Sequence, residues 1–182
     1  MAFLQIDYKS EALMRGVNIK VILPSDGMAG KWEPPYKTLY LLPGYSATAT
    51  ELITYLGLRG QSELKGIAIV LPDGENLFYQ DLPDRMTFYS TYVGKELVEV
   101  TRKMLPLSTK REDTFIGGIS MGGYGALYNG FKYRDTFSKV VAFSPAADAC
   151  MLLAGSEAPG FSRAQFEGIF GNREAYYGSE CD

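Results

Sequence analysis

One serine in this chain lies in a sequence pattern that suits covalent chemistry on a carbonyl carbon. Gly118, Ser120 and Gly122 form the pattern G-x-S-x-G. The apolar run Thr114-Phe115-Ile116 precedes it, and apolar residues at helical spacing follow it, namely Tyr124, Leu127, Tyr128 and Phe131. This context predicts a strand, a sharp turn and a helix, the arrangement called a nucleophile elbow. The alternative is a chance match, because the chain contains 20 glycines.

The spacing has a physical reason. A turn this sharp forces Ser120 into a strained backbone conformation that exposes its hydroxyl. Side chains at positions 118 and 122 would collide with the neighbouring strand and helix, so glycine is expected at both. The helix that begins at Met121 has N–H groups without intrahelical acceptors, which can face the negative charge that develops on a substrate oxygen.

Strands and helices alternate along most of the chain. Besides the strand before Ser120, hydrophobic patterns predict strands at residues 2–8, 16–23, 38–42, 67–71 and 139–143. Helices are expected from the capping box of Thr48 and Glu51 to Gly60, over residues 89–104 and from Met121. Residues 75–88 show no period and are expected to form a long loop. The first two strands are expected to pair as an antiparallel hairpin at the edge of the sheet.

This element order predicts an α/β fold of the α/β-hydrolase type, with a mostly parallel sheet and helices on both faces. We expect residues 1–182 to form a single domain whose C-terminal strands are missing. Residues 146–182 contain no further strand pattern, and Phe161, Phe166, Ile169 and Phe170 indicate short helices. These helices either pack on the sheet or form a lid over the site.

The composition of the chain excludes several classes of partner, location and cofactor from expectation. The net charge is −3 without a basic block, so nucleic acid is not expected as a partner. No apolar run reaches the length of a membrane span, and the first residues lack the pattern of a secretory signal. Cys150 and Cys181 are too few for a disulfide framework, so a cytoplasmic location is expected. With no histidine and two distant cysteines, neither a metal nor a cofactor is expected.

Four segments resemble the esterase D-like family of putative esterases, which includes tributyrin, feruloyl and acetyl-xylan esterases and S-formylglutathione hydrolases. They are 39–46 (LYLLPGYS), 71–74 (LPDG), 117–126 (GGISMGGYGA) and 142–145 (AFSP). They occur in the family's order and span most of the chain. The resemblance implies that Ser120 is the nucleophile and that Met121 donates one backbone N–H to the oxyanion. It places the second donor at Tyr45, although this chain has Pro43 where the family usually has histidine.

The departure from the family lies after the elbow. The resemblance implies an acid and a histidine on loops after two further strands, and this sequence contains neither strand and no histidine. About 60 to 80 residues are missing against the usual size of such a domain. Asp148 and Asp182 follow Ser120 but do not fall in the family's acid motif. The chain is therefore either part of a longer esterase or a short variant that has lost its chemistry.

The sequence thus predicts a serine carboxylesterase for short-chain or aryl esters, acting through an acyl-enzyme at Ser120, with the triad histidine and acid absent. A catalytically impaired binding domain and an acyltransferase are the alternatives. Asn76, Tyr79 and Tyr89 are candidates for a substrate pocket, and Asp73 is either a cleft residue or a turn carboxylate. A missing sheet edge also predicts a homo-oligomer through the exposed strand.

Overall fold

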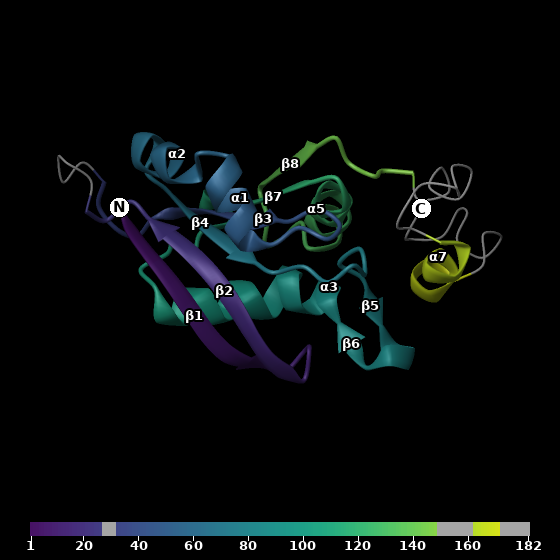
Figure 1. Cartoon of the computed structure of the whole chain (residues 1–182). Helices are drawn as coiled ribbons and strands as arrows, with labels where there is room; N and C mark the ends of the chain where they lie inside the picture. Colours follow the sequence, from purple (N-terminus) through teal and green to yellow (C-terminus); the bar gives the residue numbers. More distant parts are fainter. Residues whose placement is uncertain (27–31, 149–161, 172–182) are drawn as a thin grey trace. The chain divides into compact units, whose positions relative to one another are not determined.

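A six-stranded sheet organises the first of two units into which the chain divides in this computed structural model (Figure 1). The structure describes residues 1–26, 32–148 and 162–171. The first unit is Met1–Pro145 and the second is Ala146–Asp182, and each is described by itself. The boundary coincides with the start of residues 146–182, the segment that the sequence suggests as a possible lid. Whether that segment acts as a lid stays a prediction.

The sheet has the strand order β1-β2-β4-β3-β7-β8. Its strands are β1 (Ala2–Ser10), β2 (Arg15–Leu23), β3 (Lys37–Leu42), β4 (Ile67–Pro72), β7 (Thr114–Ile119) and β8 (Lys139–Phe143). β1 and β2 pair as an antiparallel hairpin and β2 pairs antiparallel with β4, whereas β4, β3, β7 and β8 run parallel to one another. The predicted mostly parallel sheet with an antiparallel edge is therefore confirmed.

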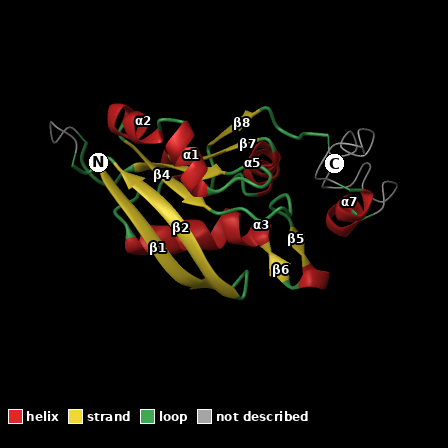
Figure 2. Cartoon of the chain, in the orientation of Figure 1, coloured by secondary structure: helices red, strands yellow, loops and turns green. Residues whose placement is uncertain are grey.

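Helices cover the two faces of the sheet unequally (Figure 2). They are α1 (Ala49–Tyr55), α2 (Leu58–Lys65), α3 (Tyr89–Thr91), the π-helical turn η2 (Tyr92–Glu96), α4 (Leu97–Met104) and α5 (Met121–Lys132). On one face α5 packs on β7 and β8, and the Tyr40 hydroxyl of β3 bonds to the Thr101 hydroxyl of α4 at 2.9 Å. On the other face α1 and α2 form an apolar cluster with residues of β2, β3 and β4.

Two predicted elements differ from the structure. The helix expected to run to Gly60 ends at Tyr55, because Gly57 adopts a left-handed conformation (φ 59°) and starts α2, which contains Gly60. The expected loop at residues 75–88 contains a small sheet of β5 (Asp81–Leu82) and β6 (Thr87–Phe88), joined by the 3₁₀ turn η1 (Pro83–Arg85). Two-residue strands are too short to give a hydrophobic period, so the pattern misses them.

The predicted helix over residues 89–104 is confirmed as α3, η2 and α4 in succession, and the short 3₁₀ turn η3 (Arg111–Asp113) precedes β7. In the second unit the structure describes α7 (Arg163–Phe170), which begins with a capping box between Ser162 and Gln165. The rings of Phe166 and Phe170 lie 4.8 Å apart between their centroids. The predicted contribution of Phe161 lies outside the described residues. No helix among the residues described is long and apolar enough to cross a membrane.

Candidate active site

Ser120 occupies the turn between β7 and α5 in a backbone conformation that residues other than glycine rarely adopt. Its φ is 56° and its ψ is −117°, and the residue is exposed. Its backbone N–H donates to the carbonyl of Phe143 at 2.9 Å, and its own carbonyl accepts from Tyr124 N–H at 3.0 Å. These bonds tie the turn to the end of β8 and to the first turn of α5. Strain that is held in this way is typical of functional positions.

Close backbone contacts explain the two glycines of the pattern. A Cβ atom on Gly118 would lie 2.0 Å from the carbonyl oxygen of Gly122. A Cβ atom on Gly122 would lie 2.1 Å from the carbonyl oxygen of Leu42, at the end of β3. Real Cβ atoms do not approach backbone oxygens this closely, and neither backbone can move away without disrupting the sheet. Both positions therefore require glycine for reasons of packing.

The loop after β3 lies against the serine. A Cβ atom on Gly44 would stand 3.5 Å from the Cβ of Ser120 and 3.2 Å from the carbonyl oxygen of Ile119. Tyr45, the next residue in this loop, is half-buried. Met121 is the first residue of α5, so its N–H has no acceptor within the helix, and its side chain is buried. The structure thus brings together Ser120, Met121 and the loop that carries Tyr45.

A second loop holds the first one in place. The Tyr79 hydroxyl donates to the carbonyl of Pro43 at 2.7 Å, and the Asn76 side-chain oxygen accepts from the N–H of Ser46 at 2.7 Å. Tyr79 is fully buried, and burial raises the pKa of its hydroxyl well above the ordinary value, so the hydroxyl keeps its proton and remains a donor.

Asn76 and Tyr79 therefore support the loop that carries Tyr45. Their predicted part in a substrate pocket stays a prediction, and a fully buried Tyr79 offers no surface to a ligand. The sequence does not predict this supporting role, because Tyr79 and Pro43 are 36 residues apart and no sequence pattern links such positions.

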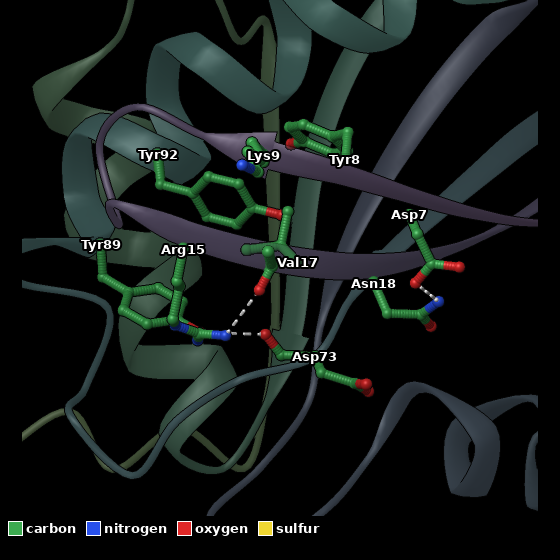
Figure 3. A pocket seen from close by; sticks show the side chains of 10 residues that line it. Asp7, Tyr8, Lys9, Arg15, Val17, Asn18, Asp73, Tyr89 and Tyr92 are labelled. Carbon is green, nitrogen blue, oxygen red and sulfur yellow. Dashed lines mark hydrogen bonds between the residues drawn. The ribbon is translucent and has the colours of Figure 1, made fainter.

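The Asp73 side chain accepts a hydrogen bond at the start of helix α1. Its Oδ1 accepts from the N–H of Ala49 at 2.7 Å, at the start of α1, where Thr48 and Glu51 also form the predicted capping box. A carboxylate in this position stabilises the first turn of a helix. Asp73 also lines a pocket of about 540 Å³ beside the β1–β2 hairpin, together with Arg15 and Tyr89 (Figure 3). Ser120 does not line this pocket, so the predicted pocket residue Tyr89 lies in a different hollow.

Strained residues gather at one end of the parallel strands. Seven residues other than glycine have a positive φ among those described, and five of them follow the carboxyl ends of β3, β4, β7 and β8. These five are Ser46, Phe78, Tyr79, Ser120 and Ser144. In open α/β sheets ligands bind at the carboxyl ends of the strands, and backbone strain concentrates at such sites. The arrangement therefore marks this end as the candidate active site.

The sequence supplies no histidine that could accept the Ser120 proton. No group of three or more Cys, Asp or Glu residues that could hold a metal ion occurs within 1–26, 32–148 and 162–171. Asp148 belongs to the second unit, and Asp182 lies outside the described residues. The site therefore offers an exposed serine in a strained conformation beside a helix start, in a chain that has no histidine.

Comparisons with known proteins agree with this geometry. Residues 10–176 match the family described as Putative esterase. An acetyl esterase of Caldicellulosiruptor saccharolyticus is 40% identical over 151 residues, and an S-formylglutathione hydrolase of Paracoccus denitrificans is 28% identical over 192 residues. The substrate-bound fluorophosphonate-binding serine hydrolase F of Staphylococcus aureus superimposes with a TM-score of 0.85 at 29% identity.

These matches cover a larger share of this chain than of its relatives. The matches cover 80%, 92% and 100% of this chain but only 57%, 63% and 70% of the acetyl esterase, the S-formylglutathione hydrolase and the staphylococcal hydrolase. The chain thus spans less than two thirds of the length of both curated relatives. The family match nevertheless extends over most of the residues of this chain, including the elbow and the loop at Tyr45. The chain belongs to the Putative esterase family and has the α/β-hydrolase fold.

Proposed function

We propose that this chain carries the nucleophile of a serine carboxylesterase that acts on short-chain or aryl esters through an acyl-enzyme at Ser120. The observation that carries the proposal is the conformation of Ser120, which is exposed at φ 56° directly before α5 and beside Gly44. A hydroxyl held in this way can approach a carbonyl carbon while backbone amides stand where the oxyanion forms. The 40% identity to an acetyl esterase supports an ester substrate with a small acyl group.

The reaction follows from these groups. The Ser120 oxygen forms a bond to the ester carbonyl carbon and passes its proton to water or to a base from other polypeptide, which later returns it to the leaving alcohol, and the carbonyl oxygen becomes an anion. The N–H groups of Met121 and Tyr45 are the proposed donors to that anion. The intermediate then breaks its bond to the alcohol, which leaves with a proton, and the acyl group remains on Ser120. Water attacks the acyl-enzyme in the same manner, releases the acid and restores the hydroxyl.

The proton of Ser120 has no histidine acceptor in this chain. Loss of one triad member leaves about 10³- to 10⁴-fold catalysis over water, which the oxyanion site and substrate binding supply. Turnover by the chain alone is therefore expected to be slow, and full activity requires a base from other polypeptide. The absence of histidine also favours the second candidate, a hydrolase-fold binding domain with impaired catalysis. An acyltransferase would share the acyl-enzyme and differ only in the acceptor.

A fluorophosphonate probe tests the proposal, because it labels serines whose hydroxyl is activated. The wild-type chain should be labelled covalently at Ser120, slowly because no histidine assists the hydroxyl, and Ser120→Ala should not be labelled. Ser144→Ala is the matched control, since Ser144 is another exposed serine with a positive φ at the end of the neighbouring strand. Labelling that survives Ser120→Ala would refute the assignment, and absence of labelling in the wild type would favour the binding domain.

A further inference from the structure

Residues 76–80, which we call the bridging loop, bond to both of the segments that carry the proposed oxyanion donors. One segment is residues 43–46, which follow β3 and include Tyr45, and the other is helix α5, whose first residue is Met121. Two amides can stabilise one oxyanion only if both stay fixed relative to the attacking oxygen of Ser120. The contacts of the bridging loop therefore bear on the alignment of the site.

The bridging loop bonds to residues 43–46 at both ends of that segment. The Tyr79 hydroxyl donates to the carbonyl of Pro43, and the Asn76 side-chain oxygen accepts from the N–H of Ser46, each at 2.7 Å. Each bond orients a whole peptide unit, because the peptide bond is planar and does not rotate freely. The two peptide units that are oriented in this way flank the middle unit of the segment.

The middle peptide unit carries the N–H of Tyr45. Its carbonyl belongs to Gly44 and accepts from the N–H of Ala47 at 3.2 Å. This peptide bond is trans, so its N–H points away from its carbonyl, and the bond to Ala47 also directs the Tyr45 N–H. The direction of this proposed donor thus depends on the neighbouring peptide units, which the bridging loop holds.

The backbone of the bridging loop is strained where it makes the first of these bonds. Phe78 and Tyr79 have φ values of 56° and 58°, a left-handed conformation that aromatic residues rarely adopt. Both side chains are buried. Such a conformation costs free energy and persists only where surrounding contacts hold it. The position of the Tyr79 hydroxyl therefore depends on contacts outside the bridging loop.

Helix α5 supplies these contacts. The side-chain amide of Asn129 donates to the carbonyl of Tyr79 at 3.2 Å and to the carbonyl of Gly125 at 2.8 Å. The Tyr79 ring packs directly on the helix backbone, since a Cβ atom on Gly125 would lie 2.4 Å from it. The next residue, Gln80, donates from its amide to the Tyr124 hydroxyl at 2.6 Å. The bridging loop is thus tied to the same helix that begins beside Ser120.

Asn129 is not a side chain that stability alone would favour at this position. It is fully buried, and its side-chain oxygen has no hydrogen-bond donor within the described part of the chain. A buried acceptor without a partner destabilises the folded state. The favourable contribution of the side chain is its two donated bonds, one of which ends on the residue whose hydroxyl holds Pro43.

From these contacts we infer that Asn129 is a positioning residue of the oxyanion site and acts through Tyr79. Asn129 holds the left-handed conformation of Tyr79, and Tyr79 holds the carbonyl of Pro43. This bond keeps the Tyr45 N–H directed at the developing oxyanion. The inference rests on the proposed function of Ser120 and extends the site to the C-terminal half of α5.

The first test measures amide hydrogen exchange of residues 44–47 in the full chain, residue by residue, by nuclear magnetic resonance. This measurement does not depend on the reactivity of Ser120. Asn129→Ala and Tyr79→Phe should each speed the exchange about 10-fold, because a loop that loses its anchor opens more often. Asn129→Leu repeats the measurement with a side chain of similar size, so that a cavity left by alanine does not decide the result.

The second test measures the rate of covalent labelling by a fluorophosphonate over a range of probe concentrations, which separates the maximal rate from the affinity for the probe. Asn129→Ala should lower the maximal rate about 10-fold and leave the affinity within about 2-fold, because a misdirected amide stabilises the transition state less without changing the pocket. Adding Asn129→Ala to Tyr79→Phe should cause no further loss, since Asn129 acts through the Tyr79 hydroxyl.

Ser62→Ala is the matched control for both tests. Ser62 is fully buried on α2 and donates to the carbonyl of Ile67 at 2.8 Å, so the variant also removes a buried bond from a side chain to the backbone. It should leave the exchange of residues 44–47 and the maximal rate of labelling within about 2-fold of the wild type, because it does not touch the bridging loop.

Three results would overturn the inference. They are unchanged exchange of residues 44–47 in Asn129→Leu, additive effects of Asn129→Ala and Tyr79→Phe on the maximal rate, and a loss of probe affinity with an unchanged maximal rate. Absence of labelling in the wild type would instead refute the proposed function of Ser120. The exchange rates would then still show whether Asn129 holds residues 43–46 in place, so the two failures are distinguishable.

Discussion

The two outer strands of the sheet face their surroundings in different ways. β1 alternates half-buried apolar residues with exposed residues that are mostly polar, namely Phe3, Gln5, Asp7 and Lys9. Its one large exposed ring, Phe3, is covered by the guanidinium of Arg59 at 4.8 Å from the ring centroid. β8 instead exposes Val141 and Phe143. Polar and charged side chains protect an edge strand from further pairing, and β1 carries them whereas β8 exposes apolar side chains.

The hollows beside the two edges show the same contrast. The pocket near β1 is bordered by charged and phenolic side chains that bond to one another (Figure 3). There Arg15 bonds to the Glu75 carboxylate and to the Tyr89 hydroxyl, and Asp7 accepts from the Asn18 amide at 2.8 Å. Hollows near β8 are lined mainly by aliphatic and aromatic side chains. A solvated, internally paired pocket needs no occupant, whereas an apolar hollow gains free energy when it is covered.

The largest expected effect is a loss of stability at alkaline pH. Burial raises the pKa of Tyr40 and of Tyr89 to about 12, against 10 in the unfolded chain. Both hydroxyls thus keep their protons longer in the folded state, so their contribution is complete below pH 10 and is lost as pH rises toward 12. Each loss amounts to about 3 kcal/mol in the free energy of unfolding. Urea titrations from pH 8 to 12 measure it.

Tyr89→Phe separates this effect from a general loss of stability. The variant keeps the ring that packs edge-on against Tyr79 and Tyr92 and removes only the ionisable hydroxyl. Its free energy of unfolding at pH 8 should stay within about 1 kcal/mol of the wild type, whereas its decline above pH 10 should be shallower. An unchanged decline would mean that Tyr89 does not contribute to the alkaline transition.

The second prediction compares one substitution at two strands. Val21 in β2 is fully buried, whereas Val141 in β8 is 43% exposed. Val21→Ala removes two buried methyl groups and leaves a cavity, which should lower the free energy of unfolding by about 2 kcal/mol. Val141→Ala should lower it by less than about 1 kcal/mol, because water already reaches this side chain. Equal losses in urea unfolding would contradict the difference in burial between Val21 and Val141.

The sequence anticipates those parts of the fold that depend on neighbouring residues. Ser120 between two glycines, the hairpin of β1 and β2, and the capping box at Thr48 are all local patterns, and the structure contains each of them. The sequence pattern predicts the break at Gly60, whereas the structure has it at Gly57, because both glycines lie within one stretch of helical spacing and only the left-handed conformation of Gly57 distinguishes them.

Contacts between distant segments could not be anticipated in the same way. The approach of Gly44 to Ser120 and the bond from Tyr79 to Pro43 join residues on different strands and loops. They depend on the order in which the strands assemble, since β3 lies between β4 and β7 in the sheet. A single sequence shows which residues precede and follow Ser120, but it does not show that Asn76 and Tyr79 hold the loop beside it.

The smallest expected effect concerns the ion pair between Glu75 and Arg15, of which Arg15 lines the pocket near β1. Arg15 and Glu75 form a salt bridge, but their side chains are 45% and 46% exposed. Exposed pairs contribute little, so Glu75→Gln should change the free energy of unfolding at pH 7 by no more than about 0.5 kcal/mol. The same variant should lower the pKa of Tyr89, since the Glu75 charge raises this pKa in addition to burial. Urea unfolding measures the free energy of unfolding, and ultraviolet titration of the phenols measures the pKa of Tyr89. A loss of stability above about 1 kcal/mol would show that this pair contributes more than its exposure allows, and that contribution would weaken at high salt, where exposed ion pairs are screened.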